Sequence, residues 1–147
     1  MKLIYNYKLS CVRTRSSHEK FPYCLRDDGN YYNLEFNPIS TALIAYGSDD
    51  NNRETLDATI ISEIKSQHTI TALPNDKGNI GWELTLIIPF TLFIHNTIRP
   101  LCGKHCQANF FKCGDDLPAP HFLSWNPVGH PQPNFHLPRF FGKIMFR

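Results

Sequence analysis

The chain of 147 residues has little net charge and no long apolar run. Its 15 basic and 13 acidic side chains leave a formal charge of +2, and the basic residues are scattered along the sequence. A nucleic-acid partner would need a basic patch, so we expect none. The longest apolar stretch, residues 84–93, is interrupted by Thr85, Pro89 and Thr91. It is too short to span a bilayer, so we expect no membrane partner.

The sequence also lacks the features of a disulfide-bonded secreted domain. The first twelve residues contain no apolar run of seven residues or more and no small-residue cleavage motif, so we expect no signal peptide. The five cysteines are an odd number, and at least one thiol must be free or pair with another chain. The count favours a reducing compartment, with all five thiols reduced.

The remaining composition is that of one globular domain spanning residues 1–147. Apolar residues make up 41% and charged residues 19% of the chain, which has enough residues to bury a core without disulfides. Most of the 11 prolines lie from Pro100 onward, so the last third of the chain should be rich in loops.

Alternation of apolar and polar residues predicts strands over 31–37 and 82–88. The helical spacing of Leu56, Ile60 and Ile64 predicts one helix near residues 56–66. Residues 13–22 are polar and are expected to form a loop. Further strands are expected at 3–12, 41–46, 69–73, 107–111 and 142–146. The fold class is therefore all-β, an antiparallel β-sandwich with one short helix.

The stretch from Asn109 to Pro127, NFFKCGDDLPAPHFLSWNP, could in principle hold a metal. Candidate zinc ligands are Cys102, His105, Cys106 and Cys113. Their spacing lacks the two close pairs of a structural zinc site, and buried thiols are the favoured interpretation. The adjacent carboxylates of Asp115 and Asp116 could bind calcium, but such pairs more often form a turn. We expect no cofactor, with calcium as the alternative.

Catalysis is poorly supported by the same stretch. Glycoside hydrolysis needs two carboxyl groups that face each other across a sugar, whereas Asp115 and Asp116 are sequence neighbours whose side chains tend to diverge. Glu35 and Glu83 lie on predicted strands with nothing to bring them together. No nucleophile, phosphate-loop or zinc-protease motif is present. We expect no enzyme activity, and a glycoside-active enzyme is the least favoured alternative.

A ligand platform is the third interpretation. An aromatic ring can stack on the C–H face of a sugar while polar groups bond its hydroxyls. Trp125 offers the ring, and Asn126, Asp115, Asp116 and His121 are polar residues near it in the sequence. The alternative is that Trp125 closes the core and that Asn126 and Pro127 only turn the chain.

Several blocks of the sequence resemble family-nine-like carbohydrate-binding domains of bacterial carbohydrate-utilising systems. The run from Asn109 to Pro127, followed by PNFHLPRFFGKIMF, resembles their C-terminal signature. YYNLEFN and GWELTLIIPF resemble two other blocks in the same order, and CVRTR resembles a fourth. The resemblance covers the chain from Cys11 onward. It implies a non-catalytic β-sandwich of jelly-roll or immunoglobulin-like form that binds carbohydrate.

The resemblance also implies site residues. Better-studied members hold a sugar between two tryptophans with help from polar side chains, and they carry structural calcium. Trp125 then corresponds to a platform residue and Asn126 to its hydrogen-bonding neighbour, while Trp82 belongs to the framework. The strand that carries Asn33, Glu35 and Asn37 could supply further polar contacts.

The sequence departs from the family pattern at its N-terminal side. FPYCLRDDG stands where relatives have a strand with an aromatic and acidic lead-in, and MKLIYNYKL replaces the strands before CVRTR. We therefore expect an incomplete sheet without the second aromatic wall, for which Tyr23 is the only nearby substitute. An incomplete sheet suggests an alternative function, a structural or interaction fragment that self-associates through an exposed sheet edge.

Overall fold

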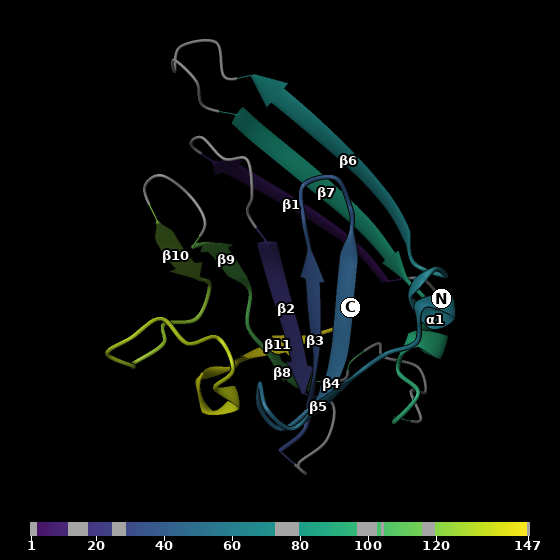
Figure 1. The fold of residues 1–147 in the computed structure, drawn as a ribbon, viewed down its shortest axis with the longest axis vertical. Coiled ribbons are helices and arrows are strands. Elements are labelled where there is room, and N and C mark those ends of the chain that lie inside the picture. The colour runs from purple at the N-terminus through teal and green to yellow at the C-terminus, as the bar shows by residue number, and fades with distance from the viewer. Residues whose placement is uncertain are drawn as a thin grey trace.

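The computed structural model describes residues 3–11, 18–24, 29–72, 80–96, 103, 105–115 and 120–146, with the backbone alone for 3–11, 18–24, 72 and 80. It contains two antiparallel sheets that pack face to face (Figure 1). The smaller sheet has the order β1-β7-β6. Its strands are β1 (Leu3–Cys11), β6 (Lys65–Ala72) and β7 (Ile80–Ile88). The predicted antiparallel β-sandwich is confirmed.

The larger sheet has eight strands in the order β10-β9-β2-β3-β4-β5, with β8 pairing to both β2 and β11. Its strands are β2 (His18–Cys24), β3 (Tyr31–Phe36), β4 (Ala42–Gly47), β5 (Arg53–Thr55), β8 (His105–Ala108), β9 (Phe111–Gly114), β10 (His121–Ser124) and β11 (Gly142–Met145). In Figure 1 the β9–β10 hairpin lies at one side of this sheet, on the far side of β2 from β3.

The predicted helix at 56–66 is reduced to one turn, α1 (Ala58–Ile61). Asp57 caps it by accepting hydrogen bonds from the Thr59 hydroxyl and from the Thr59 backbone N–H, and these bonds lower the pKa of the Asp57 carboxyl. Lys65 already belongs to β6, so the strand limits the helix. Two short 3-10 helices are η1 (Phe90–Leu92) and η2 (Pro138–Phe140). Within the described residues, no helix has the length and apolar character needed to cross a membrane.

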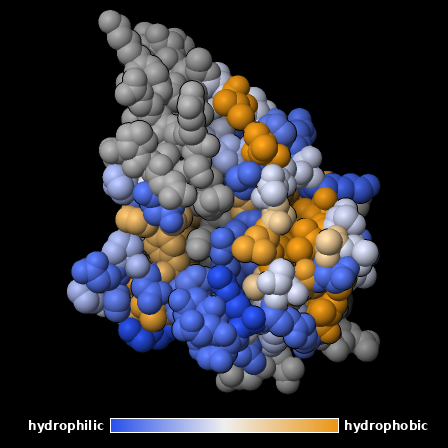
Figure 2. All heavy atoms as spheres, in the orientation of Figure 1, coloured by the Kyte–Doolittle hydropathy of each residue, from blue (hydrophilic) through white to orange (hydrophobic). Residues whose placement is uncertain are grey.

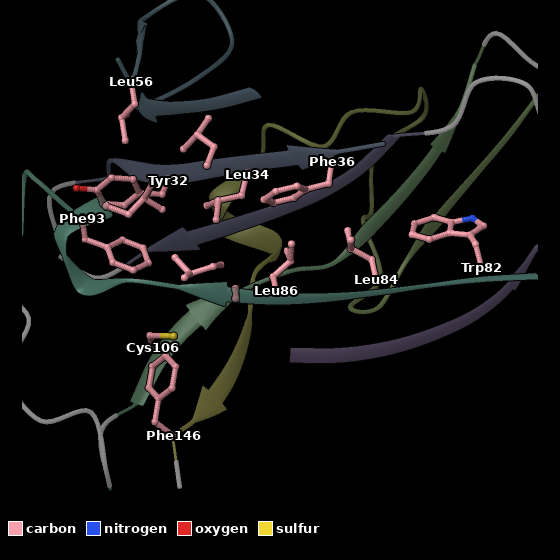
Figure 3. Packing of buried hydrophobic residues seen from close by; sticks show 14 residues of the cluster. Tyr32, Leu34, Phe36, Leu56, Trp82, Leu84, Leu86, Phe93, Cys106 and Phe146 are labelled. Atoms are coloured by element: carbon pink, nitrogen blue, oxygen red, sulfur yellow. The ribbon is translucent and has the colours of Figure 1, made fainter. Parts of the chain in front are cut away.

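The core lies between the two sheets, as Figure 3 shows. Alternate residues of β3, such as Leu34 and Phe36, meet alternate residues of β7, such as Leu84 and Leu86. Trp82 lies at one end of the cluster, beyond Leu84, and is 4% exposed. Its predicted place in the framework is confirmed.

The structure corrects the prediction for residues 13–22. His18–Cys24 is a strand that pairs with β3 along one edge and with β8 and β9 along the other. It occupies the place where the sequence comparison suggested a missing strand. Its alternation is weak because it carries charges at Glu19 and Lys20, so the neighbouring strands and not its own pattern fix its conformation. The predicted strand 107–111 is also divided, since β8 ends at Ala108 and β9 begins at Phe111.

Candidate ligand-binding site

The β9–β10 hairpin presents a row of side chains on the side of the larger sheet that faces the core. Lys112 pairs with Glu19 of β2, which pairs with the core residue Phe36, so Lys112 points to the core side. Across the hairpin, Lys112 pairs with Leu123 and Gly114 with His121. The Trp125 backbone N–H donates to the Phe110 carbonyl at 2.8 Å, which extends the same register by one step. We call Phe110, Lys112, His121, Leu123 and Trp125 the hairpin face.

The two sides of this hairpin differ in how they are covered. On the outer side, Phe135 stacks on Phe111 with ring centroids 4.3 Å apart. On the hairpin face, Leu123 is 52% and Trp125 53% exposed. An exposed tryptophan beside an exposed leucine forms an apolar area, which makes this face a candidate for binding a ligand or partner.

Trp125 is held on one side and open on the other. Its ring meets the Phe110 ring edge-on, with centroids 5.6 Å apart, and Phe110 itself packs against the core. A Cβ atom at Gly142 would lie 2.6 Å from Trp125 Cζ3, so the indole fits only because position 142 has no side chain. Trp125 therefore does not close the core. Packing against Phe110 and Gly142 fixes one side of the indole ring, and the other side is exposed to solvent. We call these packing contacts the seat of Trp125.

Asn109 is the polar centre that positions this tryptophan. It is fully buried, and its side-chain Nδ2 donates to the carbonyl oxygens of Asn126 at 2.9 Å and Phe140 at 3.2 Å. Its Oδ1 accepts from the backbone N–H groups of Phe110 and Asn126. Asn109 thus joins β8, the segment after β10 and η2 with all of its usual bonding capacity. The network fixes the backbone on both sides of Trp125.

Lys112 and His121 form the polar part of the hairpin face. The Lys112 side chain is 2% exposed and its Nζ is hydrogen-bonded to His121 Nε2. The pair places an amine and an imidazole side by side at the Gly114 end of the hairpin face.

The other predicted site residues near Trp125 lie in different positions. Asn126 uses its side-chain Nδ2 to donate to the Phe140 carbonyl at 2.9 Å, so it contributes to the seat of Trp125. Asp115 is exposed at the turn that follows β9, at the His121 end of the hairpin. Asp116 lies outside the described residues.

The polar residues of β3 are on the opposite face of the larger sheet. Asn33 and Glu35 alternate with the core residues Leu34 and Phe36. Asn33 is 2% exposed and donates to Glu35, whose Oε1 lies 3.7 Å from Nη1 of Arg53. They therefore do not converge with Trp125.

Asn37 is further away, at the β3–β4 turn. Its Oδ1 accepts from the backbone N–H groups of Ile39 and Thr41, which closes the turn. Tyr31 also lies on the outer face of β3, where its hydroxyl is 2.8 Å from His136 Nδ1 and burial raises its pKa.

The described residues contain no group of three His, Cys, Asp or Glu side chains placed to hold a metal. His105 is exposed and its neighbour Cys106 is buried, so they point to opposite sides of β8. Cys106 and Cys113 are free buried thiols, while Cys102 lies outside the described residues.

Comparison with known proteins assigns this chain to a family. The model of carbohydrate-binding family 9 matches residues 5–146. The chain belongs to this family. A solved structure of a candidate carbohydrate-binding protein from Bacteroides uniformis ATCC 8492 superimposes with a TM-score of 0.82 at 33% identity. The match covers 99% of this chain and 72% of that one. No curated protein matches the chain at a significant level.

Some residues that shape this candidate site were not assigned a role from the sequence. Gly142 and Phe110 surround the indole, Asn109 fixes the backbone, and Leu123 extends the apolar surface. Leu123 could have been found, because HFLSW places Leu123 and Trp125 on one face of a strand. The role of Asn109 depends on contacts 17 and 31 residues away, for which the sequence has no local signal.

Proposed function

We propose that the chain is a non-catalytic carbohydrate-binding module whose ligand stacks on Trp125 of the hairpin face. The observation that carries the proposal is the exposed, seated indole in a member of carbohydrate-binding family 9. A pyranose ring presents a face of C–H groups that suits an indole, and a fixed ring loses little conformational entropy on binding.

The row beside Trp125 suits more than one sugar unit. His121, Leu123 and Trp125 alternate along the same side of β10, and four residues at about 3.3 Å per residue span about 13 Å. Trp125 would stack on one ring, Leu123 would contact the next, and the His121 side chain would form part of the polar rim. The rim would be completed by Asp115 at the far turn or by Asp116, its neighbour in the sequence.

Among the residues that the structure describes, the hairpin face offers binding groups but no pair of acids for turnover. Of the acidic candidates, Glu35 is engaged with Asn33 and Arg53 on the opposite sheet face, and Asp115 is on a turn. A platform with one stacking ring predicts weak affinity, with a dissociation constant near 1 mM, or about −4 kcal/mol. A dissociation constant of this size suits a module that binds its carbohydrate reversibly and releases it quickly.

A soluble-oligosaccharide array followed by calorimetric titration of the best hit tests the function. Trp125→Ala should weaken binding at least tenfold, about 1.4 kcal/mol, without lowering the melting temperature. Trp125→Phe should keep part of the affinity because it retains a ring. Leu43→Ala is a matched control, since Leu43 is 45% exposed on the opposite face and pairs with Glu35.

Two results would contradict the proposal. One is an array without any hit for a folded protein, and the other is a hit whose affinity is unchanged by Trp125→Ala and reduced by Leu43→Ala. Product sugars appearing during the titration would instead restore the enzyme alternative.

A further inference from the structure

The β6 strand forms a long edge of the smaller sheet. It pairs with β7 over all eight of its residues, from Lys65 opposite Ile87 to Ala72 opposite Ile80, and no other described strand pairs with it. All its described side chains, residues 65–71, are exposed, although their partners Trp82, Leu84 and Leu86 on β7 are buried. Burial therefore ends at β7, and β6 extends beyond the core.

This edge has few of the features that prevent strands from pairing with other molecules. Natural edge strands are usually short, bulged, rich in charge or interrupted by proline. β6 has an unbroken register and a single charge at Lys65, and it contains the β-branched run Thr69–Thr71. Ile70 is 47% exposed on it, and hydrophobic residues reach the surface in the upper part of Figure 2, where Figure 1 places β6 and β7.

A neighbouring turn adds apolar surface to the edge. Ser40 of the β3–β4 turn is 3.1 Å from His68 Nδ1, which ties the turn to β6. Ile39, next to Ser40, is 61% exposed. A strand that docks on β6 would cover both exposed isoleucines.

We propose that β6 pairs in antiparallel fashion with β6 of a second copy of this chain, which would join the two small sheets into one of six strands. A two-fold axis at Thr69 places Thr69 opposite Thr69, His68 opposite Ile70 and Gln67 opposite Thr71. Each pair then lies on one face of the joined sheet, as side-chain alternation requires.

The charges favour a second copy as the occupant. Lys65 lies four residues from the axis, so the two ammonium groups are about 26 Å apart along the joined strands. That distance is well beyond the screening length of about 8 Å at physiological salt. The edge therefore carries no like-charge repulsion against itself, and it offers no row of charges that would recruit an oppositely charged partner.

Sedimentation equilibrium of the full chain across a dilution series tests the proposal. The wild-type protein should reach twice the monomer mass and dissociate on dilution, and Thr69→Lys should stay monomeric. The substitution opposes two ammonium groups at the axis, while within one chain the new lysine faces Glu83 across β7. Thr55→Lys is the control, because it adds the same charge at an exposed position of β5 and should leave the dimer intact.

Hydrogen exchange on the wild-type protein gives a second measurement that does not depend on a variant. Amides of β6 should become more protected as the protein concentration rises, while those of β5 should not. A wild-type chain that is monomeric at every concentration overturns the proposal. A Thr69→Lys dimer, or protection of β6 amides that is independent of concentration, also overturns it.

Discussion

The two tryptophans of this chain show how one residue type takes opposite roles in a sandwich. Trp82 is 4% exposed on β7, between two strands and under the larger sheet. Trp125 is 53% exposed at the end of β10, although it too points to the core side of its sheet. Both indole side chains thus point to the core side of their sheets, but the opposite sheet covers only Trp82.

Cover depends on the sizes of the two sheets. In the described part of the chain the larger sheet has eight strands and the smaller one three, and part of the larger sheet's inner side is exposed at the β9–β10 hairpin. Exposed apolar residues such as Leu123 lie on that part. A pattern of alternating residues can indicate which side faces inward, but it cannot indicate how far the opposite sheet extends.

The substitution Trp82→Ala should have the largest effect, which is a loss of unfolding free energy. Truncation of a buried aromatic residue costs about 3 to 5 kcal/mol of unfolding free energy, and chemical denaturation should show a loss of that size. Sugar affinity of the fraction that stays folded should be unchanged. The Nε1 of Trp82 is buried without a hydrogen-bond partner among the described residues, so Trp82→Phe should cost much less. Equal losses for both variants would contradict the assignment of Trp82 to apolar packing.

Asn109→Ala should have the next largest effect, and it should connect the two regions. It leaves the Asn126 carbonyl oxygen and two backbone N–H groups without their partner, while the Phe140 carbonyl keeps its hydrogen bond from Asn126 Nδ2. Each unsatisfied buried group costs about 1 to 3 kcal/mol, so both unfolding free energy and sugar affinity should fall. Asn109→Asp retains the acceptor but turns a carboxylate oxygen toward the Asn126 and Phe140 carbonyls, so it should lose stability and affinity as well. A variant that loses stability and keeps full affinity would show that the network does not position Trp125.

The sequence predicted the strands whose own residues alternate clearly between apolar and polar. YYNLEFN became β3, and the alternation around Trp82 became β7 with its tryptophan in the core. The strands β2, β5 and β10 were missed because their neighbours hold them: β2 is charged, β5 has three residues and β10 has four. Such short or polar strands are defined by the register of the sheet and not by local propensity.

The candidate site was predicted only in part. Trp125 could be selected because an aromatic residue beside polar residues in the sequence is chemically distinctive, but its exposure is known only from the structure. The family resemblance grouped Asn33 and Glu35 with it, and the structure places them on the opposite face, where Asn33 donates to Glu35 and Glu35 lies near Arg53. Sequence proximity and residue type do not show which face of a sheet a strand turns to the ligand, because this depends on how the strand pairs.

Gly142→Ala should produce a smaller and more specific change. The added methyl group would lie within 2.6 Å of the Trp125 ring, and the indole must tilt away to avoid it. We expect several-fold weaker sugar binding with a small change in melting temperature, read by titration and by iodide quenching of Trp125 in a Trp82→Phe background. Gly129→Ala is the control, since its methyl would meet Phe140 at an ordinary 3.4 Å. Unchanged quenching and affinity in Gly142→Ala would show that the space beside the Trp125 ring can hold a methyl group.

The smallest expected effect is a loss of unfolding free energy at alkaline pH. The fluorescence emission of the two tryptophans should respond differently to it. Burial raises the pKa of Tyr32 to about 12 from its usual value near 10. The neutral phenol is thus favoured in the folded state, so this contribution to stability is complete below pH 10 and is lost as the pH rises toward 12. Tyr32 touches the core residue Phe93, and its hydroxyl accepts from the His95 backbone N–H.

Unfolding of the core should therefore be seen by Trp82 in a Trp125→Phe variant as the pH passes 10. Trp125 is already half exposed, so its emission in a Trp82→Phe variant should change less over the same range. Tyr32→Phe should flatten the fall of unfolding free energy between pH 10 and 12, at the cost of a small loss at neutral pH from the unpaired His95 N–H. If both variants show the same emission change, the environment of Trp125 depends on the core as much as that of Trp82 does. The contrast between a buried Trp82 and a surface Trp125 would then be wrong.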